Sequence, residues 1–412
     1  MRSNEELDKI LGVILDIGAE MIKSGAETHR VEDTLYRLAA AYHLSNPNFW
    51  VVPTNIQSTI TADSGQHLTQ IRHIRSAGIV FDRLDALNDL SRKVCSSPLS
   101  SFELEQEFKS ILGKPEQSIW ISMIAGILSG AAFGVFFSCN LLDTVAAAAA
   151  SLVITFFRRT LMPRESNPLV LNFLISVITE LVILLCITLG IGNHIGAITT
   201  GAIMLLISGL GVTNGIRDLV HLDTFSGLVN LTASLTGAIG IALGIALPLS
   251  LLHAPESMDI PGLQANLSLS LASSMIACIG FAIWMDVRGW KTIACGLGGF
   301  LSWSVFLYLS YCNAGTFFCS LCASAVCAIF AQIMARVFKA PATIFMTVSL
   351  FPLIPGADLY RMMYGIVIGN LSLYHTFGSS LLMTCFGIVL GFMVIETAEK
   401  SLRSRRRLNG FK

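Results

Sequence analysis

Two short segments interrupt apolar stretches of the chain with glycine, proline and charged residues. The first, 209–218, reads GLGVTNGIRD, and the second, 351–361, reads FPLIPGADLYR. Each predicts a break in a membrane helix, which frees backbone N–H and C=O groups that lipid cannot satisfy. At such breaks a half-helix N-terminus can face a carboxylate, and freed carbonyls can face an ammonium. An amino acid carries both charges, so a pair of broken helices suits that kind of substrate.

Side chains beside the two breaks supply candidate contacts to such a substrate, and Thr213 and Asn214 can add hydrogen bonds of their own. The candidate substrate-binding residues are Thr213, Asn214, Arg217, Asp218, Pro352, Pro355, Gly356, Asp358 and Tyr360. The alternative is that both segments are ordinary loops with charges at the membrane edge. Their matched placement along the chain favours broken helices.

Glu180 lies in the middle of the apolar stretch 175–185, where a carboxylate costs a few kcal/mol at bilayer depth. Intramembrane acids commonly carry protons in transporters, because desolvation favours the protonated form. Glu180 is therefore a candidate proton-coupling residue. The alternative is a protonated glutamate that only bonds a neighbouring helix. By contrast, Asp143, Asp286 and Glu396 fall near the ends of predicted spans, where we expect interfacial positions.

The composition indicates a membrane protein. The 412 residues are 53% hydrophobic and 13% charged, with mean hydropathy +0.67, outside the range of soluble globular proteins. Formal net charge is zero, which gives no reason to expect a nucleic-acid partner. Charge concentrates in residues 1–118, whereas 119–397 hold long apolar runs. The start of the chain, from Asn4 to Lys9, carries both signs of charge and does not resemble a signal peptide.

A helix that crosses the hydrocarbon core needs about 20 mostly apolar residues. Ten segments meet or approach this length: 119–139, 142–158, 168–189, 195–212, 225–249, 265–285, 290–311, 314–335, 341–355 and 376–397. The fold class expected is therefore a polytopic α-helical membrane protein.

The distribution of Lys and Arg supports this count. With residues 1–115 in the cytoplasm, the inner loops receive Lys or Arg near 158–164, 217, 288–291 and 336–339, and the tail 398–412 adds more. The outer connections near 140, 192, 252–264 and 312 contain none, and only Arg361 falls on the outer side. Cytoplasmic loops carry an excess of these residues, so ten spans with both termini cytoplasmic are expected.

A polar connector, 252–264, separates a first module, 116–251, from a second, 265–397. Each module has five spans, and an odd number implies that equivalent modules are inserted upside down relative to each other. Such inverted repeats recur in secondary transporters, with the site at broken helices near the midplane. Here the fourth span of each module runs into one of the two interrupted segments.

Residues 1–115 read as a small cytoplasmic α+β domain. Helices are expected at 5–23, from about 27 to 43, at 81–95 and at 101–112, and strands at 49–53, 56–62 and 67–74. Gly25 is expected to end the first helix, and the spacing of Ser24 and Glu27 suggests a capping box.

No cofactor or metal site is expected. His29, His43, His67 and His73 lack a nucleophile elbow or ligand spacing, and Cys319 and Cys322 lack a second ligand pair. The ten cysteines, mostly in apolar segments, suggest packing rather than disulfides.

Three motifs resemble one family of transporters. Gly25-Ala26-Glu27-Thr28 is similar to the signature in the soluble part of the threonine/serine exporter family. The segment 214–219 is similar to that family's first-module motif, although the proline expected ahead of it is replaced by Gly209-Leu-Gly-Val. The segment 352–356 resembles its second-module Pro-x-x-Pro-Gly motif.

The resemblance covers nearly the whole chain and implies export of small hydroxy amino acids across the plasma membrane, driven by protons. Some relatives, split into two polypeptides, are associated with dicarboxylate export. Two other readings remain: a membrane-anchored enzyme whose residues 1–115 act as a hydrolase, and a passive channel. Glycines spaced by four, such as Gly240 and Gly244, indicate close helix packing and are compatible with a homo-oligomer.

Overall fold

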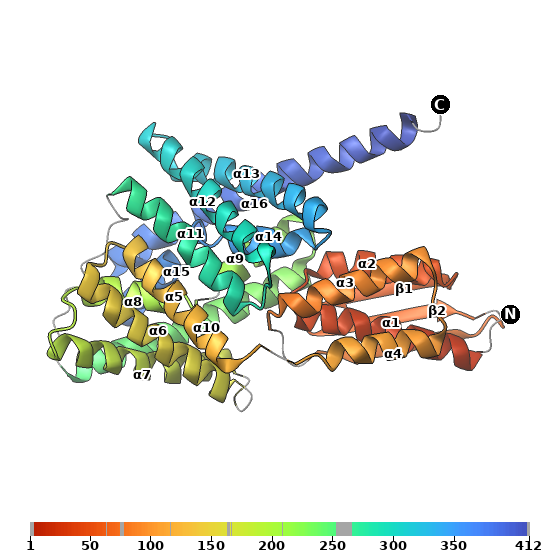
Figure 1. Cartoon of the computed structure of the whole chain (residues 1–412), viewed down its shortest axis with the longest axis horizontal. Coiled ribbons are helices and arrows are strands. Elements are labelled where there is room, and N and C mark those ends of the chain that lie inside the picture. The colour runs from red at the N-terminus through yellow and green to blue at the C-terminus, as the bar shows by residue number, and fades with distance from the viewer. Residues whose placement is uncertain are drawn as a thin grey trace. The chain divides into compact units, whose positions relative to one another are not determined.

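The computed structural model describes residues 4–62, 64–74, 78–115, 117–162, 165, 167–207, 209–252 and 266–409. The chain forms two compact units (Figure 1). Unit 1 contains residues 1–117, 285–288 and 335–344, and unit 2 contains 118–284, 289–334 and 345–412. The predicted connector 252–264, apart from Leu252, lies outside the described residues.

Unit 1 combines four helices with a three-stranded antiparallel sheet of order β1-β2-β3. The elements are α1 (Asn4–Lys23), α2 (Thr28–Ala41), β1 (Ser45–Val52), β2 (Asn55–Thr61), β3 (His67–His73), α3 (Phe81–Ser96) and α4 (Ser101–Leu112). Each lies within a few residues of its expected range.

The end of α1 follows the sequence, but the start of α2 does not. Gly25 has φ +95°, a conformation that glycine adopts without a steric penalty, and it ends α1 as expected. The capping box predicted from Ser24 is wrong. Glu27 is the N-cap of α2 and makes no side-chain capping hydrogen bond, while Ser24 is buried at the end of α1.

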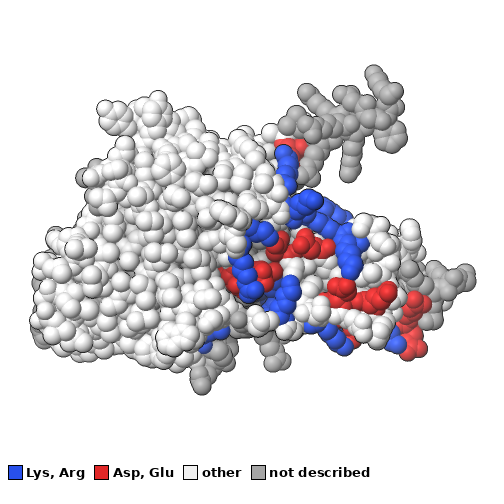
Figure 2. All heavy atoms as spheres, in the orientation of Figure 1, with Lys and Arg blue, Asp and Glu red and all other residues white. Residues whose placement is uncertain are grey.

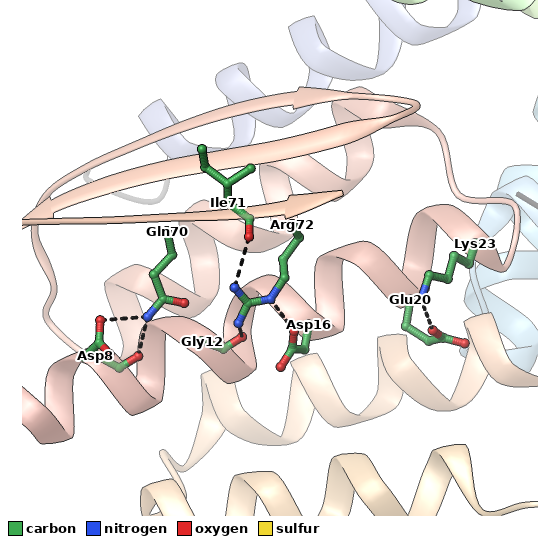
Figure 3. Close-up of polar contacts among 8 residues, drawn as sticks. All are labelled: Asp8, Gly12, Asp16, Glu20, Lys23, Gln70, Ile71 and Arg72. Carbon is green, nitrogen blue, oxygen red and sulfur yellow. Dashed lines mark hydrogen bonds and ion pairs between the residues drawn. The ribbon is translucent and has the colours of Figure 1, made fainter. Parts of the chain in front are cut away.

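Strand β3 is fastened to α1 by polar side chains that share one face of the strand (Figure 3). The Gln70 amide donates to the carboxylate of Asp8 at 2.7 Å and to its carbonyl at 2.9 Å. Arg72 pairs with Asp16 at 2.5 Å and donates to the carbonyl of Gly12 at 3.2 Å. Since strand side chains alternate, residues 70 and 72 both face the helix.

Helix α3 also holds the two short segments that belong to unit 1. The backbone N–H of Phe81 donates to the carbonyl of Met285 at 2.9 Å. The Arg92 guanidinium donates to the carbonyl of Lys339 at 2.8 Å. The segment 285–288 is therefore bonded to the start of α3, and the segment 335–344 is bonded to a residue near its end.

Arg288 adds an ionic contact between one of these segments and α3. It donates two hydrogen bonds to Asp286, at 2.9 and 3.2 Å, and its guanidinium lies 3.5 Å from the carboxylate of Asp82. The hydrogen bonding to Asp286 raises the pKa of Arg288 above its already high usual value. Asp286 is buried within this unit, at 7% exposure.

Unit 2 contains helices long and apolar enough to cross a membrane. Among the described residues there are eight: α5 (Ile119–Phe136), α6 (Leu141–Leu161), α7 (Pro168–Thr188), α10 (Thr224–Leu251), α11 (Leu267–Trp284), α12 (Trp290–Tyr311), α13 (Thr316–Phe338) and α16 (Leu371–Asn409). On the face drawn in Figure 2, this unit presents a broad surface with almost no charged side chains, whereas such side chains gather on unit 1.

The predicted spans 195–212 and 341–355 are not continuous helices. Each is represented by two short helices separated by a turn: α8 (Ile195–Ile203) and α9 (Gly209–Val220), then α14 (Ala342–Ser349) and α15 (Gly356–Val367). With 8 to 12 residues, none of these helices is long enough to cross the hydrocarbon core alone.

The first break lies upstream of the position that the sequence predicts. Residues 209–218, expected to unwind, are helical in α9, and the described turn residues are 204–207. The second break, 350–355, is where it was expected. Glycine weakens a helix in water, but in a buried environment the backbone groups have no competing water, so the helical bonds of 209–218 are kept.

The order of elements repeats along unit 2. Helices α8, α9 and α10 start at residues 195, 209 and 224, and α14, α15 and α16 start at 342, 356 and 371, each 147 residues later. Helices α5 and α11, the first of each set, both have 18 residues. The two broken helix pairs therefore occupy the same place in two similar runs of elements.

Glycine contacts repeat in the same way. A Cβ on Gly240 or Gly244 of α10 would lie 2.4 or 2.6 Å from the carbonyls of Leu169 or Phe173 in α7. A Cβ on Gly387 or Gly391 of α16 would lie equally close, 2.5 or 2.4 Å, to the carbonyls of residues 317 or 321 in α13. Small residues thus let the fifth helix of each run pack directly on the third.

This packing predicts the effect of adding one methyl group. We expect Gly244→Ala to destabilise the membrane unit by about 1–3 kcal/mol, because its Cβ would collide with the carbonyl of Phe173. Thermal unfolding of the detergent-purified chain measures this. Gly315→Ala is the matched control, since nothing lies within 4 Å of its Cβ position, and equal effects of the two changes would contradict the packing.

Candidate substrate site

The first residues of the two second half-helices lie against each other. A Cβ on Gly209, at the start of α9, would lie 3.3 Å from the Cα of Gly356, at the start of α15, and 2.3 Å from the side chain of Ile354. Only glycine at position 209 allows this approach. The positive ends of two helix dipoles therefore converge at one buried point, an arrangement that favours an anionic group.

The candidates on α9 divide between the near and far ends of that helix. Near its start, the Thr213 hydroxyl donates to the carbonyl of Gly209 at 3.2 Å and lies 3.8 Å from the sulfur of Cys385 in α16. Asn214 follows and is half-buried. Arg217 is buried at 3% exposure near the far end. Asp218 accepts a hydrogen bond from Asn230 of α10 at 2.9 Å.

Asp218 and Asp358 do not occupy equivalent places. Asp358 is the third residue of α15, but Asp218 is the tenth of α9, about 14 Å along the helix from its start. In the register of 147 residues, Asp358 corresponds to Gly211. Although an aspartate occurs in each interrupted segment, only Asp358 is near the meeting point.

The second-break candidates line the turn and the first turns of α15. Pro352 is buried in the turn, and Pro355 is the N-cap residue directly before Gly356. The Asp358 carboxylate accepts a hydrogen bond from Ser380 of α16 at 2.6 Å. Helix α16 thus contacts α9 through Cys385 and α15 through Ser380, and it joins the two groups of candidates.

Side chains from the second helix of each run cap carbonyls at the two breaks. Arg158 of α6 donates to the carbonyl of Leu205 at 3.1 Å. Ser302 of α12 donates to the carbonyl of Ser349 at 2.8 Å. These two carbonyls were the kind of acceptor expected to bind an ammonium, and the protein already occupies them. Neither capping residue could be identified from the sequence, because each acts on a carbonyl that is distant along the chain.

Glu180 is fully buried at the middle of α7, with 0% exposure. Its Oε2 accepts a hydrogen bond from the Thr199 hydroxyl of α8 at 3.0 Å. Its Oε1 has no hydrogen-bond partner among the described residues. Helix α13 starts at residue 316 and α7 at residue 168, so residue 328 of α13 corresponds to Glu180. Residue 328 is alanine, so this carboxylate belongs to only one of the two runs.

Tyr360 and Arg361 place two further polar groups in the interior. The Tyr360 hydroxyl and the Nη2 of Arg361 are buried and, within the described part of the chain, unpaired by any hydrogen bond. The ring centroids of Tyr360 and Tyr364, one helical turn apart, are 5.8 Å from each other. The Arg361 guanidinium also lies 5.2 Å from the ring of Phe377.

Sequence reasoning treated Arg361 only as the exception to the sorting of Lys and Arg. The structure gives a reason for that exception, because the side chain is buried, at 8% exposure, inside the protein. A buried arginine does not report on membrane topology in the way that a loop arginine does. The burial of Arg361 could have been inferred from the sequence, because this residue did not fit the sorting of Lys and Arg between inner and outer loops.

Asp143 lies in the first turn of α6, near the end of the helix as predicted from the sequence. It is fully buried and accepts hydrogen bonds from the backbone N–H groups of Asn193 and His194, at 2.7 and 3.2 Å, while its second oxygen lies 2.8 Å from the His194 ring. It also forms a capping box with Asn140. These bonds fix the turn that leads into α8, the helix that carries Thr199.

Among the described residues, no three His, Cys, Asp or Glu side chains could hold a metal ion. His29 lies on α2, His43 in the turn after it, and His67 and His73 at opposite ends of β3. All ten cysteines are free thiols.

Comparisons with known proteins agree with the resemblance in the motifs. A family described as "Putative threonine/serine exporter" matches residues 12–252, and one described as "Threonine/Serine exporter, ThrE" matches residues 270–398. A protein of Mycobacterium tuberculosis named "Probable threonine/serine exporter" is 22% identical over 408 residues, which cover 93% of this chain and 76% of that protein. No solved structure matches the chain. Its apolar helices and both family matches make this chain a multi-pass membrane protein that belongs to the threonine/serine exporter family.

Proposed function

We propose that this protein is a secondary active transporter that exports threonine and serine across the plasma membrane in exchange for protons. The observation that carries the proposal is the contact between Gly209 and Gly356, where two broken helices from equivalent places in the chain meet. Paired half-helices inside a membrane unit are the usual means by which transporters build a site for a small charged solute.

The two runs of helices are proposed to be inverted repeats, the first module at 116–251 and the second at 265–397. Packing between the runs is reciprocal: α10 contacts α15, and α16 contacts α9. The first helices of the runs, α5 and α11, pack on each other through Phe133 and Phe281, whose ring centroids are 5.6 Å apart. Both patterns are expected of two repeats related by a pseudo-two-fold axis.

The orientation follows from the same proposal. Five crossings per module place successive modules upside down, and the Lys and Arg residues of the loops put both termini, residues 1–115 and the tail 398–412 in the cytoplasm. The connector 252–264 is then external. Rocking of one repeat against the other opens the shared site to either side in turn.

Glu180 is proposed to carry the proton. It is a buried carboxyl held by a single hydrogen bond from Thr199, and the matching position in the second repeat is alanine. Burial disfavours the charged form, so a proton or another cation must accompany this group when the site is closed. One such group gives one place for the coupling ion.

Transport in liposomes tests the substrate. Purified protein in vesicles with an imposed pH gradient should accumulate labelled threonine above equilibrium, since the proton gradient drives uphill movement. Succinate, tested in the same assay, separates amino acid from dicarboxylate export. Equal threonine uptake with and without the gradient would contradict proton coupling, and uptake without saturation would indicate a channel.

Substitutions near the breaks test the site in that assay. Asn214→Ala and Asp358→Ala should each lower threonine flux by tenfold or more, roughly the loss of one buried hydrogen bond to a charged group. Asp259→Ala, in the predicted external connector, is the control and should leave flux unchanged. Full activity of both site variants would place substrate binding elsewhere.

Glu180→Gln tests the proton. The amide cannot titrate, so flux in this variant should no longer respond to the pH gradient, while insertion and folding remain intact. Threonine flux is measured at several pH values for the variant and the wild type. Size-exclusion profiles confirm that the variant is folded. Unchanged pH dependence in the variant would rule out Glu180 as the coupling group.

A further inference from the structure

Two side chains of opposite charge lie on one face of α15 without pairing. Asp358 and Arg361 are three residues apart, a spacing that leaves roughly 5–6 Å between Cβ atoms on the surface of a helix. This spacing normally allows a direct ion pair. In the part of the chain that the structure describes, no hydrogen bond or ion pair joins the two residues.

Each of these side chains has its own partner on α16. The Asp358 carboxylate accepts a hydrogen bond from the Ser380 hydroxyl at 2.6 Å. The Arg361 guanidinium lies 5.2 Å from the ring of Phe377. Residues 377 and 380 are also three apart, so one face of α16 meets the charged face of α15. The contacts with α16 therefore hold the two charges separately, although they are neighbours on the same helix.

Arg361 keeps an unused hydrogen-bond donor in the interior. The residue is 8% exposed, and its Nη2 has no hydrogen-bond partner among the described residues. Native proteins satisfy the great majority of buried polar groups, and a buried cation without a counter-ion is a costly exception. Asp358, by contrast, is only half-buried, so its carboxylate stays accessible. This combination favours a ligand that supplies an anion to Arg361.

The two charges lie beside the point where the half-helices meet. Gly356 is the first residue of α15 and lies against Gly209 of α9. Asp358 is the third residue of α15 and Arg361 the sixth, so both are within about 8 Å of that contact along the helix axis. The pair is therefore part of the same region as the candidate substrate site.

The two groups are complementary to a zwitterion. A guanidinium donates hydrogen bonds to a carboxylate, and an ionised carboxylate accepts them from an ammonium. An α-amino acid carries both groups on one carbon, so a single molecule can bind both side chains. A dicarboxylate would place its second carboxylate against Asp358, which would repel it, and a simple amine would leave Arg361 without an anion.

We infer that Asp358 and Arg361 form a subsite for the amino and carboxylate groups of an α-amino acid, an inference that rests on the proposed function. Arg361 binds the α-carboxylate, and Asp358 binds the ammonium. Ser380 is a positioning residue that orients the aspartate, and Phe377 positions the guanidinium. The subsite recognises the two groups that all amino acids share, so it selects the class of solute and excludes dicarboxylates.

Competition by analogues tests each half of the subsite. Labelled threonine bound to the purified full-length protein is displaced with threoninol, which lacks the carboxylate, with 3-hydroxybutyrate, which lacks the ammonium, and with succinate, which carries two carboxylates. The wild type should prefer threonine over each of the three by about tenfold or more.

The charge variants should each lose a different preference. Arg361→Gln should prefer threonine over threoninol by about twofold or less and should still discriminate against 3-hydroxybutyrate, whereas Arg361→Lys should keep part of the first preference. Asp358→Asn should no longer discriminate against 3-hydroxybutyrate, and it should bind succinate more tightly than the wild type because the repelling charge is gone. Arg159→Gln, at an exposed arginine of α6, is the matched control and should keep all three preferences.

Changes on α16 extend the test to variants that keep both charges. Ser380→Ala should lower the preference over 3-hydroxybutyrate by about fivefold, the effect of one hydrogen bond, and leave the preference over threoninol unchanged. Phe377→Leu should do the reverse. Preferences that stay unchanged in the charge variants and in these two, with threonine still bound, would overturn the subsite while leaving the exporter proposal standing.

Thermal stability separates recognition from a purely structural role. The double variant Asp358→Asn, Arg361→Gln buries neither charge, so its ligand-free stability should equal or exceed that of the wild type. The stabilisation that added threonine gives the wild type should be absent from it. A large loss of ligand-free stability in the double variant would assign the two charges to the fold and contradict the inference. If the wild type bound neither threonine nor serine, the proposed function and the subsite would both be overturned.

Discussion

A backbone amide in the hydrocarbon core of a membrane must find its hydrogen-bond partner within the protein. In unit 2 this requirement is met by long helices, and the two interruptions occur only where other groups take over. Arg158 caps the carbonyl of Leu205 at the first break, and Ser302 caps that of Ser349 at the second. Both caps come from the second helix of their run. A break that was not capped in this way would be expelled from the membrane interior or would close into a continuous helix.

The capped breaks bring Gly209 and Gly356 together, and glycine contacts elsewhere bring the surrounding helices close enough to enclose them. The backbone is repeated in this respect, but the side chains are not. Glu180 and Thr199 on one run correspond to Ala328 and Met346 on the other, and Gly211 corresponds to Asp358. The repeated part of unit 2 is therefore the order and close packing of its helices, whereas the polar side chains that these helices carry differ between the two runs.

Unit 1 is not confined to the start of the chain. Helix α3 bonds the segment 285–288, between α11 and α12, and the carbonyl of Lys339, between α13 and α14. Both segments belong to the same compact unit as α3, although they are distant from it in the sequence.

Much of this protein is determined by its sequence alone. The apolar stretches predicted ten spans, of which eight are long helices among the described residues, and glycine and proline indicated interruptions in the fourth segment of each run. The period of apolar residues located the helices and strands of unit 1. Glu180 could be singled out because a charge inside a 20-residue apolar segment is costly whatever surrounds it. These features follow from local composition, so no knowledge of contacts was needed.

Only the tertiary structure decided the features that depend on partners distant in the sequence. The first break lies before Gly209 because residues 209–218 keep their helical bonds in buried surroundings. Asp143 is buried within the protein because Asn193 and His194 supply its hydrogen bonds, and no local pattern in the sequence indicates these partners. Arg361 was the exception to the sorting of Lys and Arg between loops, and its burial beside Phe377 explains that exception. A sequence shows which groups are costly to bury, but the fold alone shows which of them are paired, because pairing is a property of positions in space.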